Sequence, residues 1–242
     1  MNTNLLITVH SGGLSALPNS YEYLQQACLL APDIIEVDVR KTLDDRIVLW
    51  HDAILPGCFE PISQMPYKQL LEKYPKLLVL ETALDLCGEH AISTNLDIKE
   101  FAAIPEVCRI LQKEDCLDRV VFSGCGKAEI ELIYSLLPSA RVLFNVQSWD
   151  REVFPQYKDY VLSMVQQAQD LKAFGLNVCY KDVKKEFLQY AHKHMLPVFV
   201  WTVDTRELMR EMILMGVYSL TTHNVELLRN EIAYLNDCMK VT

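Results

Sequence analysis

Residues 34–51, with the sequence IIEVDVRKTLDDRIVLWH, decide the fold. Two apolar runs, Ile34–Val39 and Val48–His51, lie at its ends, and only eight residues, Arg40–Ile47, separate them. A parallel crossover needs about a dozen residues or more, so these runs are predicted to pair as an antiparallel hairpin. Thr42-Leu43-Asp44-Asp45 supplies the turn, because aspartate tolerates left-handed backbone conformations.

Short apolar runs of this kind recur along the chain and alternate with stretches of helical period. The nine candidate strands are Leu5–His10, Ile34–Val39, Val48–His51, Ser93–Ile98, Val120–Ser123, Arg141–Val146, Leu176–Cys179, Val198–Thr202 and Ser219–Thr222. Helical patterns between them, several opened by a Ser, Asp or Thr N-cap, include Ser20–Leu30, Ile104–Gln112, Lys127–Leu136, Asp182–His194 and Thr205–Met215. Such alternation predicts a parallel sheet with helical crossovers.

Eight parallel strands remain when the hairpin partner is set aside, and the 242 residues are close to the ~250 typical of a (β/α)8 barrel. We therefore predict a TIM barrel with a short β-hairpin after its second strand, in a single domain that spans residues 1–242. A doubly wound sheet fits less well, because His10-Ser11-Gly12-Gly13 lacks the third glycine of a dinucleotide fingerprint. The least regular segment, Ala53–Pro75, is predicted to be a small excursion from the barrel.

The composition excludes several classes of protein. Half of the residues are hydrophobic and the net charge is −9, which argues against disorder and against nucleic acid or anionic lipid as partners. The eight cysteines form no C-x-x-C pair, which favours a reducing compartment over a disulfide framework. No apolar run reaches ~18 residues, and Met1-Asn2-Thr3-Asn4 leads into the first strand without a basic n-region. We expect a cytoplasmic protein without stable membrane insertion; the oligomeric state stays open.

Three acidic side chains point to a metal site. Functional groups of a barrel lie at the carboxyl ends of its strands. Glu36 and Asp38 are two residues apart on one strand, so they share a face and repel each other. Asp97 lies on the next parallel strand in a similar alternation, and oxygen ligands of this kind suit Mg²⁺ or Ca²⁺. We predict one divalent cation held by these residues; ion pairs with Arg or Lys are the alternative.

Four further residues are candidates for the chemistry. His10 and His51 end apolar runs, and imidazole exchanges protons near neutral pH, although a histidine at a strand end is also a common structural residue. Lys99 shares a face with Asp97, where it either meets an anionic group such as phosphate or pairs with Asp97 or Glu36. Trp201 lies near the end of a strand, where it is either core or an apolar wall beside a substrate. His223 follows the last strand and has no partner that the sequence identifies.

The ordered motifs resemble the glycerophosphodiester phosphodiesterase family over nearly the whole chain. They are His10-Ser11-Gly12, Pro18-Asn19-Ser20, Ile35-Glu36-Val37-Asp38-Val39, Thr42-Leu43-Asp44-Asp45, Val48-Leu49-Trp50-His51-Asp52, Leu96-Asp97-Ile98-Lys99, Trp201-Thr202-Val203-Asp204 and Thr221-Thr222. The resemblance implies a TIM barrel of lipid metabolism that hydrolyses glycerophosphodiesters to glycerol 3-phosphate and an alcohol with Mg²⁺ or Ca²⁺. It also implies an acid/base pair (His10, His51), metal ligands (Glu36, Asp38, Asp97) and substrate-binding residues (Lys99, Trp201).

The chain departs from the family motifs at several positions, and three of these departures replace a charged residue. Ser11 replaces the arginine of H-R-G, Pro18 replaces the glutamate of P-E-N-T, and His223 replaces the aspartate of the closing T-D. Two alternatives to glycerophosphodiester hydrolysis therefore stay open. One is a noncatalytic or altered-specificity barrel that binds a phosphate ligand, and the other is a metal-dependent lyase or aldolase in which Lys99 forms a Schiff base.

Overall fold

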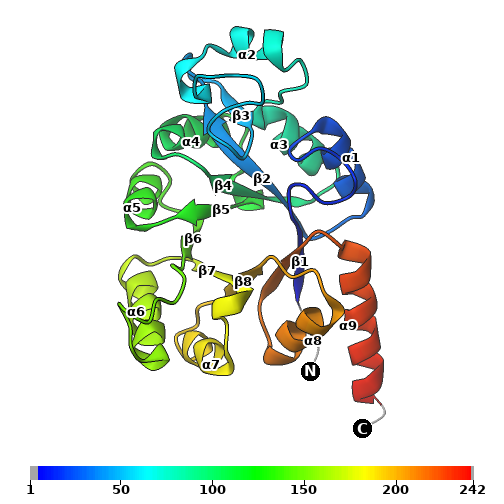
Figure 1. Cartoon of the computed structure of the whole chain (residues 1–242), viewed down its shortest axis with the longest axis vertical. Coiled ribbons are helices and arrows are strands. Elements are labelled where there is room, and N and C mark those ends of the chain that lie inside the picture. The colour runs from blue at the N-terminus through cyan, green and yellow to red at the C-terminus, as the bar shows by residue number, and fades with distance from the viewer. Residues whose placement is uncertain (1–4, 241–242) are drawn as a thin grey trace.

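Eight parallel strands close into a barrel at the centre of the molecule. A computed structural model describes residues 5–240, so residues 1–4 and 241–242 of the predicted domain, and with them the Met1–Asn4 opening, lie outside the described residues. The barrel strands are β1 (Leu6–Val9), β2 (Ile34–Lys41), β4 (Ser93–Ile98), β5 (Val120–Cys125), β6 (Arg141–Asn145), β7 (Gly175–Cys179), β8 (Val198–Trp201) and β9 (Ser219–Thr222). They follow the order β1, β9, β8, β7, β6, β5, β4, β2, and β1 pairs with β2 to close the ring (Figure 1). The predicted TIM barrel is confirmed.

The predicted hairpin is also present. Strand β3 (Ile47–Leu49) runs antiparallel to β2, with Val39 opposite Leu49 and Lys41 opposite Ile47. Asp45 takes the left-handed conformation in the turn, with φ of +62°. Pairing with β3 extends β2 two residues beyond the predicted end, and β3 stops before His51, which therefore lies in the following loop.

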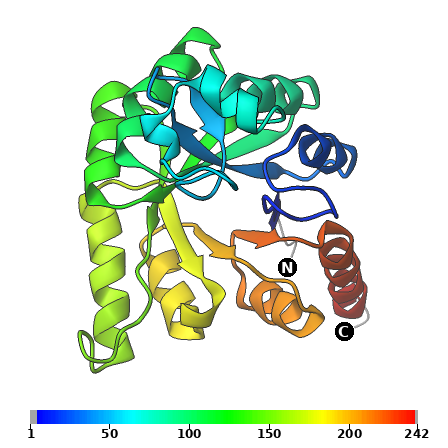
Figure 2. The same cartoon turned by 45° about the horizontal axis from the view of Figure 1, so that its top comes forward.

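Helices surround the barrel (Figure 2). Five follow the predicted patterns within a few residues: α1 (Tyr21–Leu29), α4 (Ile104–Lys113), α5 (Lys127–Leu136), α7 (Lys185–Lys193) and α8 (Arg206–Met215). The side chains of Ser20 and Thr205 cap α1 and α8 by accepting hydrogen bonds from backbone N–H groups in the first turn. The structure adds α3 (Leu80–Glu89), α6 (Tyr157–Asp170) and α9 (Val225–Lys240). Among the described residues, no helix is long and apolar enough to cross a membrane.

The irregular segment after β3 is the predicted excursion. It contains a 3-10 turn (Ile62–Gln64) and the short helix α2 (Tyr67–Lys73), which stands beside β3 at the top of Figure 1. A small apolar cluster of its own holds it to the hairpin, formed by Val48, Leu55, Ile62, Met65, Leu70 and Leu77. The excursion thus anchors the loop that carries His51.

Alternation along the strands divides the barrel into an apolar and a polar half. In β2, Ile35, Val37 and Val39 are fully buried in the large core that the helices share. The opposite face of β2 points into the barrel, where Ile34 packs with Val121, Leu143 and Phe199 in a separate apolar cluster. Glu36 and Asp38 follow Ile34 on that inner face, nearer the carboxyl ends of the strands. The barrel therefore has an apolar floor and an acidic mouth.

Gly124 of β5 permits a close approach to β4. Its φ is +72°, and a Cβ atom there would lie 2.5 Å from both Asp97 Oδ1 and Ile98 O. Gly57 has a similar φ of +77° but no atom within 4 Å of such a Cβ. An alanine at Gly57 would therefore meet only the cost of a left-handed backbone, whereas an alanine at Gly124 would meet that cost and a steric clash.

We expect Gly57→Ala to lower the free energy of unfolding by about 1–2 kcal/mol, the usual cost of a left-handed alanine. Gly124→Ala adds the clash with β4, so it should cost at least about 1 kcal/mol more. Urea denaturation followed by circular dichroism measures both changes. Equal losses in the two variants would contradict the close β4–β5 approach.

Candidate active site

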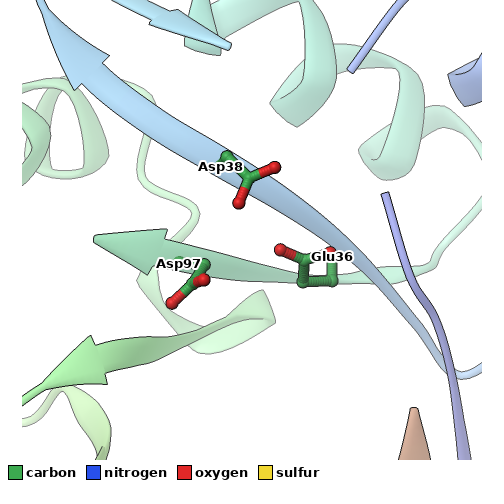
Figure 3. A group of neighbouring side chains, drawn as sticks. All are labelled: Glu36, Asp38 and Asp97. Atoms are coloured by element: carbon green, nitrogen blue, oxygen red, sulfur yellow. The ribbon is translucent and has the colours of Figure 1, made fainter. Parts of the chain in front are cut away.

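Three carboxyl groups meet at the mouth of the barrel. Glu36 and Asp38 come from β2 and Asp97 from β4, and Asp38 lies directly opposite Asp97 in the strand register (Figure 3). One oxygen atom from each of the three lies within 4.8 Å of the other two. Glu36 and Asp38 are buried, with 5% and 2% of their surface exposed, and Asp97 is half-buried. The three acids that the sequence predicted to share a site do lie together.

The loop between β1 and α1 holds two of these acids in place. The Ser11 backbone N–H donates to Glu36 Oε2 at 2.7 Å, and the Ser11 hydroxyl donates to Asp38 Oδ2 at 2.8 Å. The Asn19 amide donates to the same Asp38 oxygen at 2.7 Å and accepts from the Asp38 backbone N–H at 3.0 Å. Asn19 adopts a left-handed φ of +58° to do so.

Lys99 pairs with two of the carboxylates. Its Nζ lies 2.9 Å from Asp38 Oδ1 and 2.5 Å from Asp97 Oδ2. Burial works to lower the pKa of Lys99, but Asp97 and Asp38 outweigh it and raise that pKa. Burial likewise works to raise the pKa of Asp38, and the bonds from Lys99, Asn19 and Ser11 outweigh it and lower that pKa. The ion-pair interpretation of Lys99 thus holds for Asp97, with Asp38 rather than Glu36 as the second partner.

Glu36 is the acid that this arrangement leaves uncompensated. Burial raises its pKa well above the usual value, and the neighbouring Asp38 and Asp97 raise it further. The Asn95 side-chain oxygen, opposite Glu36 on β4, is buried and has no hydrogen-bond partner among the described residues. Three carboxyl groups and a spare buried amide oxygen form an all-oxygen donor set, which fits a hard divalent cation.

The His10 side chain lies between the acids and β9. Its Nδ1 lies 2.5 Å from the Ser11 carbonyl oxygen and 3.9 Å from Glu36 Oε2. Because a carbonyl oxygen can only accept, Nδ1 carries the proton and Nε2 keeps its lone pair. Burial lowers the pKa of His10, although the bond to Ser11 works to raise it.

His51 approaches the site from the loop after β3. Its Nδ1 lies 2.8 Å from Asp52 Oδ1, and its ring is exposed. The Arg40 side chain donates to the His51 carbonyl oxygen through Nε at 2.9 Å and Nη2 at 2.7 Å. The loop backbone is thereby tied to the end of β2, next to the acids.

All seven predicted site residues line one cavity of about 290 Å³ at the carboxyl ends of the strands: His10, Glu36, Asp38, His51, Asp97, Lys99 and Trp201. Of the two interpretations of Trp201, the structure favours the wall of the cavity over the core, because 36% of its surface is exposed. The floor and far wall include residues that the sequence did not single out, among them Ser123, Asn145 and Asn177.

These additional residues form a polar row on β5, β6 and β7. Ser123 donates to Asp97 Oδ1 at 3.1 Å. Asn145 Oδ1 accepts from the Gly124 backbone N–H at 2.9 Å and from the Asn177 amide at 3.0 Å. The signal that could have revealed them is a polar residue near the end of each apolar run, the same signal that indicated Asp97.

One cavity at the carboxyl ends of the strands is thus lined by carboxyl groups, two imidazoles and an ammonium group. Active sites of TIM-barrel enzymes lie at this end of the barrel. The chain belongs to the glycerophosphoryl diester phosphodiesterase family, whose model matches residues 10–227, and it is a phosphoric diester hydrolase.

Individual relatives agree with this assignment. A glycerophosphodiester phosphodiesterase from Caldanaerobacter subterraneus subsp. tengcongensis is 23% identical over 245 residues, which cover 93% of this chain and 96% of the relative. The crystal structure of a glycerophosphodiester phosphodiesterase from Parabacteroides distasonis has a TM-score of 0.82, with 21% identity over 98% of this chain and 100% of that one. A phosphodiesterase from Oleispira antarctica, in complex with the product sn-glycerol-3-phosphate, has a TM-score of 0.81, with 16% identity over 94% and 96% of the two chains.

The raised pKa of Glu36 predicts a pH-dependent loss of stability in the metal-free protein. Above about pH 4.3 an unfolded glutamate has lost its proton. Folded Glu36 still holds one because its pKa is raised, so rising pH favours unfolding until that folded pKa is passed. Glu36→Gln removes this penalty and keeps an acceptor for the Ser11 N–H, so we expect it to stabilise the protein by about 1–3 kcal/mol at pH 8.

Urea unfolding in EDTA between pH 4.5 and pH 8 measures the effect. The matched control is Glu60→Gln, because Glu60 is exposed and lies outside the cavity. Parallel pH profiles for wild type and Glu36→Gln would show that Glu36 ionises normally.

Proposed function

We propose that this protein hydrolyses glycerophosphodiesters to glycerol 3-phosphate and an alcohol, with one divalent cation, Mg²⁺ or Ca²⁺, and with His10 and His51 as the acid/base pair. The observation that carries the proposal is that one cavity is lined by all seven side chains that this reaction would use: the two histidines, the three acids, Lys99 and Trp201. The complex of the Oleispira antarctica neighbour with sn-glycerol-3-phosphate supports the choice of substrate class. We further propose that residues 1–242 act as one domain, in the cytoplasm and in lipid metabolism.

Glu36, Asp38 and Asp97 would hold the cation. Bound there, it would supply positive charge to a non-bridging oxygen of the phosphate. Its charge would also allow Glu36 to lose its proton, since it would offset the burial and the neighbouring carboxylates that raise the pKa of Glu36. The Lys99 ammonium, which now bridges Asp38 and Asp97, would then be free to contact phosphate oxygens.

The two histidines differ in the partner of Nδ1, and this difference suggests their roles. His10 donates to a neutral carbonyl oxygen, is half-buried and has a lowered pKa, so we assign it as the base that takes the proton from the attacking water. His51 Nδ1 lies against the Asp52 carboxylate, and we assign His51 as the acid that protonates the leaving alkoxide. Both then have Nε2 available for the substrate.

Trp201 and Lys99 are proposed to bind the substrate on two sides. Lys99 supplies a point charge for the phosphate. The exposed ring of Trp201 supplies an apolar surface on the same cavity, suited to the carbon atoms of glycerol or of the leaving group.

A barrel of altered specificity, which takes another phosphate ligand as its substrate, is the second candidate. The observation in its favour concerns Ser11, which stands where the family motif has arginine. Its backbone N–H donates to Glu36 and its hydroxyl donates to Asp38, so neither group is available to a phosphate. A bidentate arginine contact is typically stronger than a point contact from lysine. Hydrolysis of another phosphodiester, with no release of alcohol from the glycerophosphodiesters, would support this candidate.

We expect the wild-type protein to release glycerol 3-phosphate from a panel of glycerophosphodiesters in Mg²⁺ or Ca²⁺ and not in EDTA. His10→Ala and His51→Ala should each lower turnover by roughly 10²–10⁴-fold, the usual contribution of a general acid or base. The control is His192→Ala, because His192 is exposed on α7 and does not line the cavity. Near-normal turnover in either active-site variant would reject its role.

Metal binding can be measured without any assay of activity. At a concentration about 100 times its dissociation constant, a cation that binds only the folded state adds about 2.7 kcal/mol to the free energy of unfolding. We expect Mg²⁺ or Ca²⁺ to stabilise wild type and Glu60→Gln in this way, and Asp97→Asn much less. Titration calorimetry supplies the dissociation constants. Equal stabilisation of Asp97→Asn would remove Asp97 from the ligand set.

A further inference from the structure

His223 lies against the ring of His10. Val9 and Thr222 are paired in the β1–β9 register, and the backbone N–H of His10 donates to the Thr222 carbonyl oxygen at 3.0 Å. The two histidines therefore follow strand ends that are hydrogen-bonded to each other. Their ring centroids are 4.6 Å apart, with 50° between the ring planes. The neighbouring turn leaves little room, because a Cβ at Gly13 would lie 3.1 Å from the His223 carbonyl oxygen.

Asp204 fixes the position of His223. One carboxylate oxygen lies 2.8 Å from His223 Nδ1, and the other accepts from the His223 backbone N–H at 2.8 Å and from the Thr222 hydroxyl at 3.1 Å. Because the carboxylate accepts, Nδ1 of His223 carries a proton and its ring plane is set by a charge-assisted bond. This is the partner of His223 that the sequence did not identify.

His10 itself has few constraints of its own. Its ring makes one hydrogen bond, from Nδ1 to the Ser11 carbonyl oxygen of the adjacent residue, and 30% of its side chain is exposed. A single bond to a neighbouring residue permits rotation about the side-chain torsions. A second restraint on the His10 ring is its tilted contact with the ring of His223, which Asp204 holds in place.

We propose that Asp204 and His223 form a positioning pair that holds the His10 imidazole in the orientation its proton transfer requires. The proposal rests on the proposed function of His10. His223 acts through His10 and not on the substrate, because it is absent from the residues that line the 290 Å³ cavity. It borders instead a separate surface depression beside α1 and α9, with Leu14 and Glu226.

The test compares a variant that loses the ring with one that keeps it. His223→Ala removes the contact, so we expect kcat to fall by about 10–100-fold, the cost of misplacing a reacting group by about an ångström. KM should stay within about twofold, since substrate binding is not affected. His223→Phe keeps a ring against His10 without an ionisable group, and kcat should return to within about threefold of wild type.

Asp204 gives an independent check through a double-mutant cycle. Asp204→Ala frees the His223 ring, so it should lower kcat in the wild-type background. In the His223→Phe background there is no Nδ1 to hold, and Asp204→Ala should lower kcat less than in wild type, because only its bonds to the residue-223 backbone N–H and the Thr222 hydroxyl are lost. His192→Ala is the control for loss of a histidine, and urea unfolding confirms that each variant is folded.

A readout independent of turnover separates this proposal from the proposed function. Long-range ¹H–¹⁵N spectra report which nitrogen of His10 carries its proton. We expect the single Nδ1–H form in wild type and His223→Phe, and a mixture of forms in His223→Ala, whether or not the wild type releases glycerol 3-phosphate. The proposal is overturned if His223→Ala keeps the wild-type kcat and spectrum, or if His223→Phe is as impaired as His223→Ala.

Discussion

The concentration of negative charge at the barrel mouth is the constraint on which the rest of the site depends. Burying an ionised carboxylate costs several kcal/mol unless hydrogen bonds or an opposite charge compensate it. Here Asp38 receives the hydroxyl of Ser11, the amide of Asn19 and the ammonium of Lys99. Glu36 is bonded by Ser11 alone, and burial, together with the neighbouring Asp38 and Asp97, raises its pKa well above the usual value. The site without a cation therefore balances its charge by sharing one lysine and retaining one proton.

The barrel keeps this concentration of negative charge apart from its apolar core. Inward residues at the floor are apolar, and those at the mouth are polar, while the outward face of the same strands packs under the helices. Parallel register places Asp38 opposite Asp97 without any loop to position them. Gly124 then lets β5 approach so closely that Ser123 bonds to Asp97. Rigid strands thus hold the acids, and loops bring the histidines.

The features of the fold and site that could be predicted from the sequence are those with a local and periodic pattern. The period-two spacing of Glu36 and Asp38, the short Arg40–Ile47 connection and the alternation of strands with helices sufficed for the barrel, the hairpin and the acidic cluster. Prediction failed where the partner is remote in the chain: nothing local links Asp204 to His223, or Asn145 to Asn177. The place of His51 at the cavity depends on how the excursion packs, and both the end of an apolar run and the resemblance to the family indicated it.

The substitution of serine for arginine in the first motif changes what the β1–α1 loop does. An arginine there would present a charged fork to a phosphate. Ser11 instead directs its N–H and hydroxyl to Glu36 and Asp38, so the loop contributes to the acid scaffold and not to the anion. Among the described residues that line the cavity, Lys99 is then the one lysine or arginine, and both of its contacts go to acids. Recognition of the phosphate and neutralisation of the acids are thereby coupled, because any group that takes over the carboxylates releases the lysine.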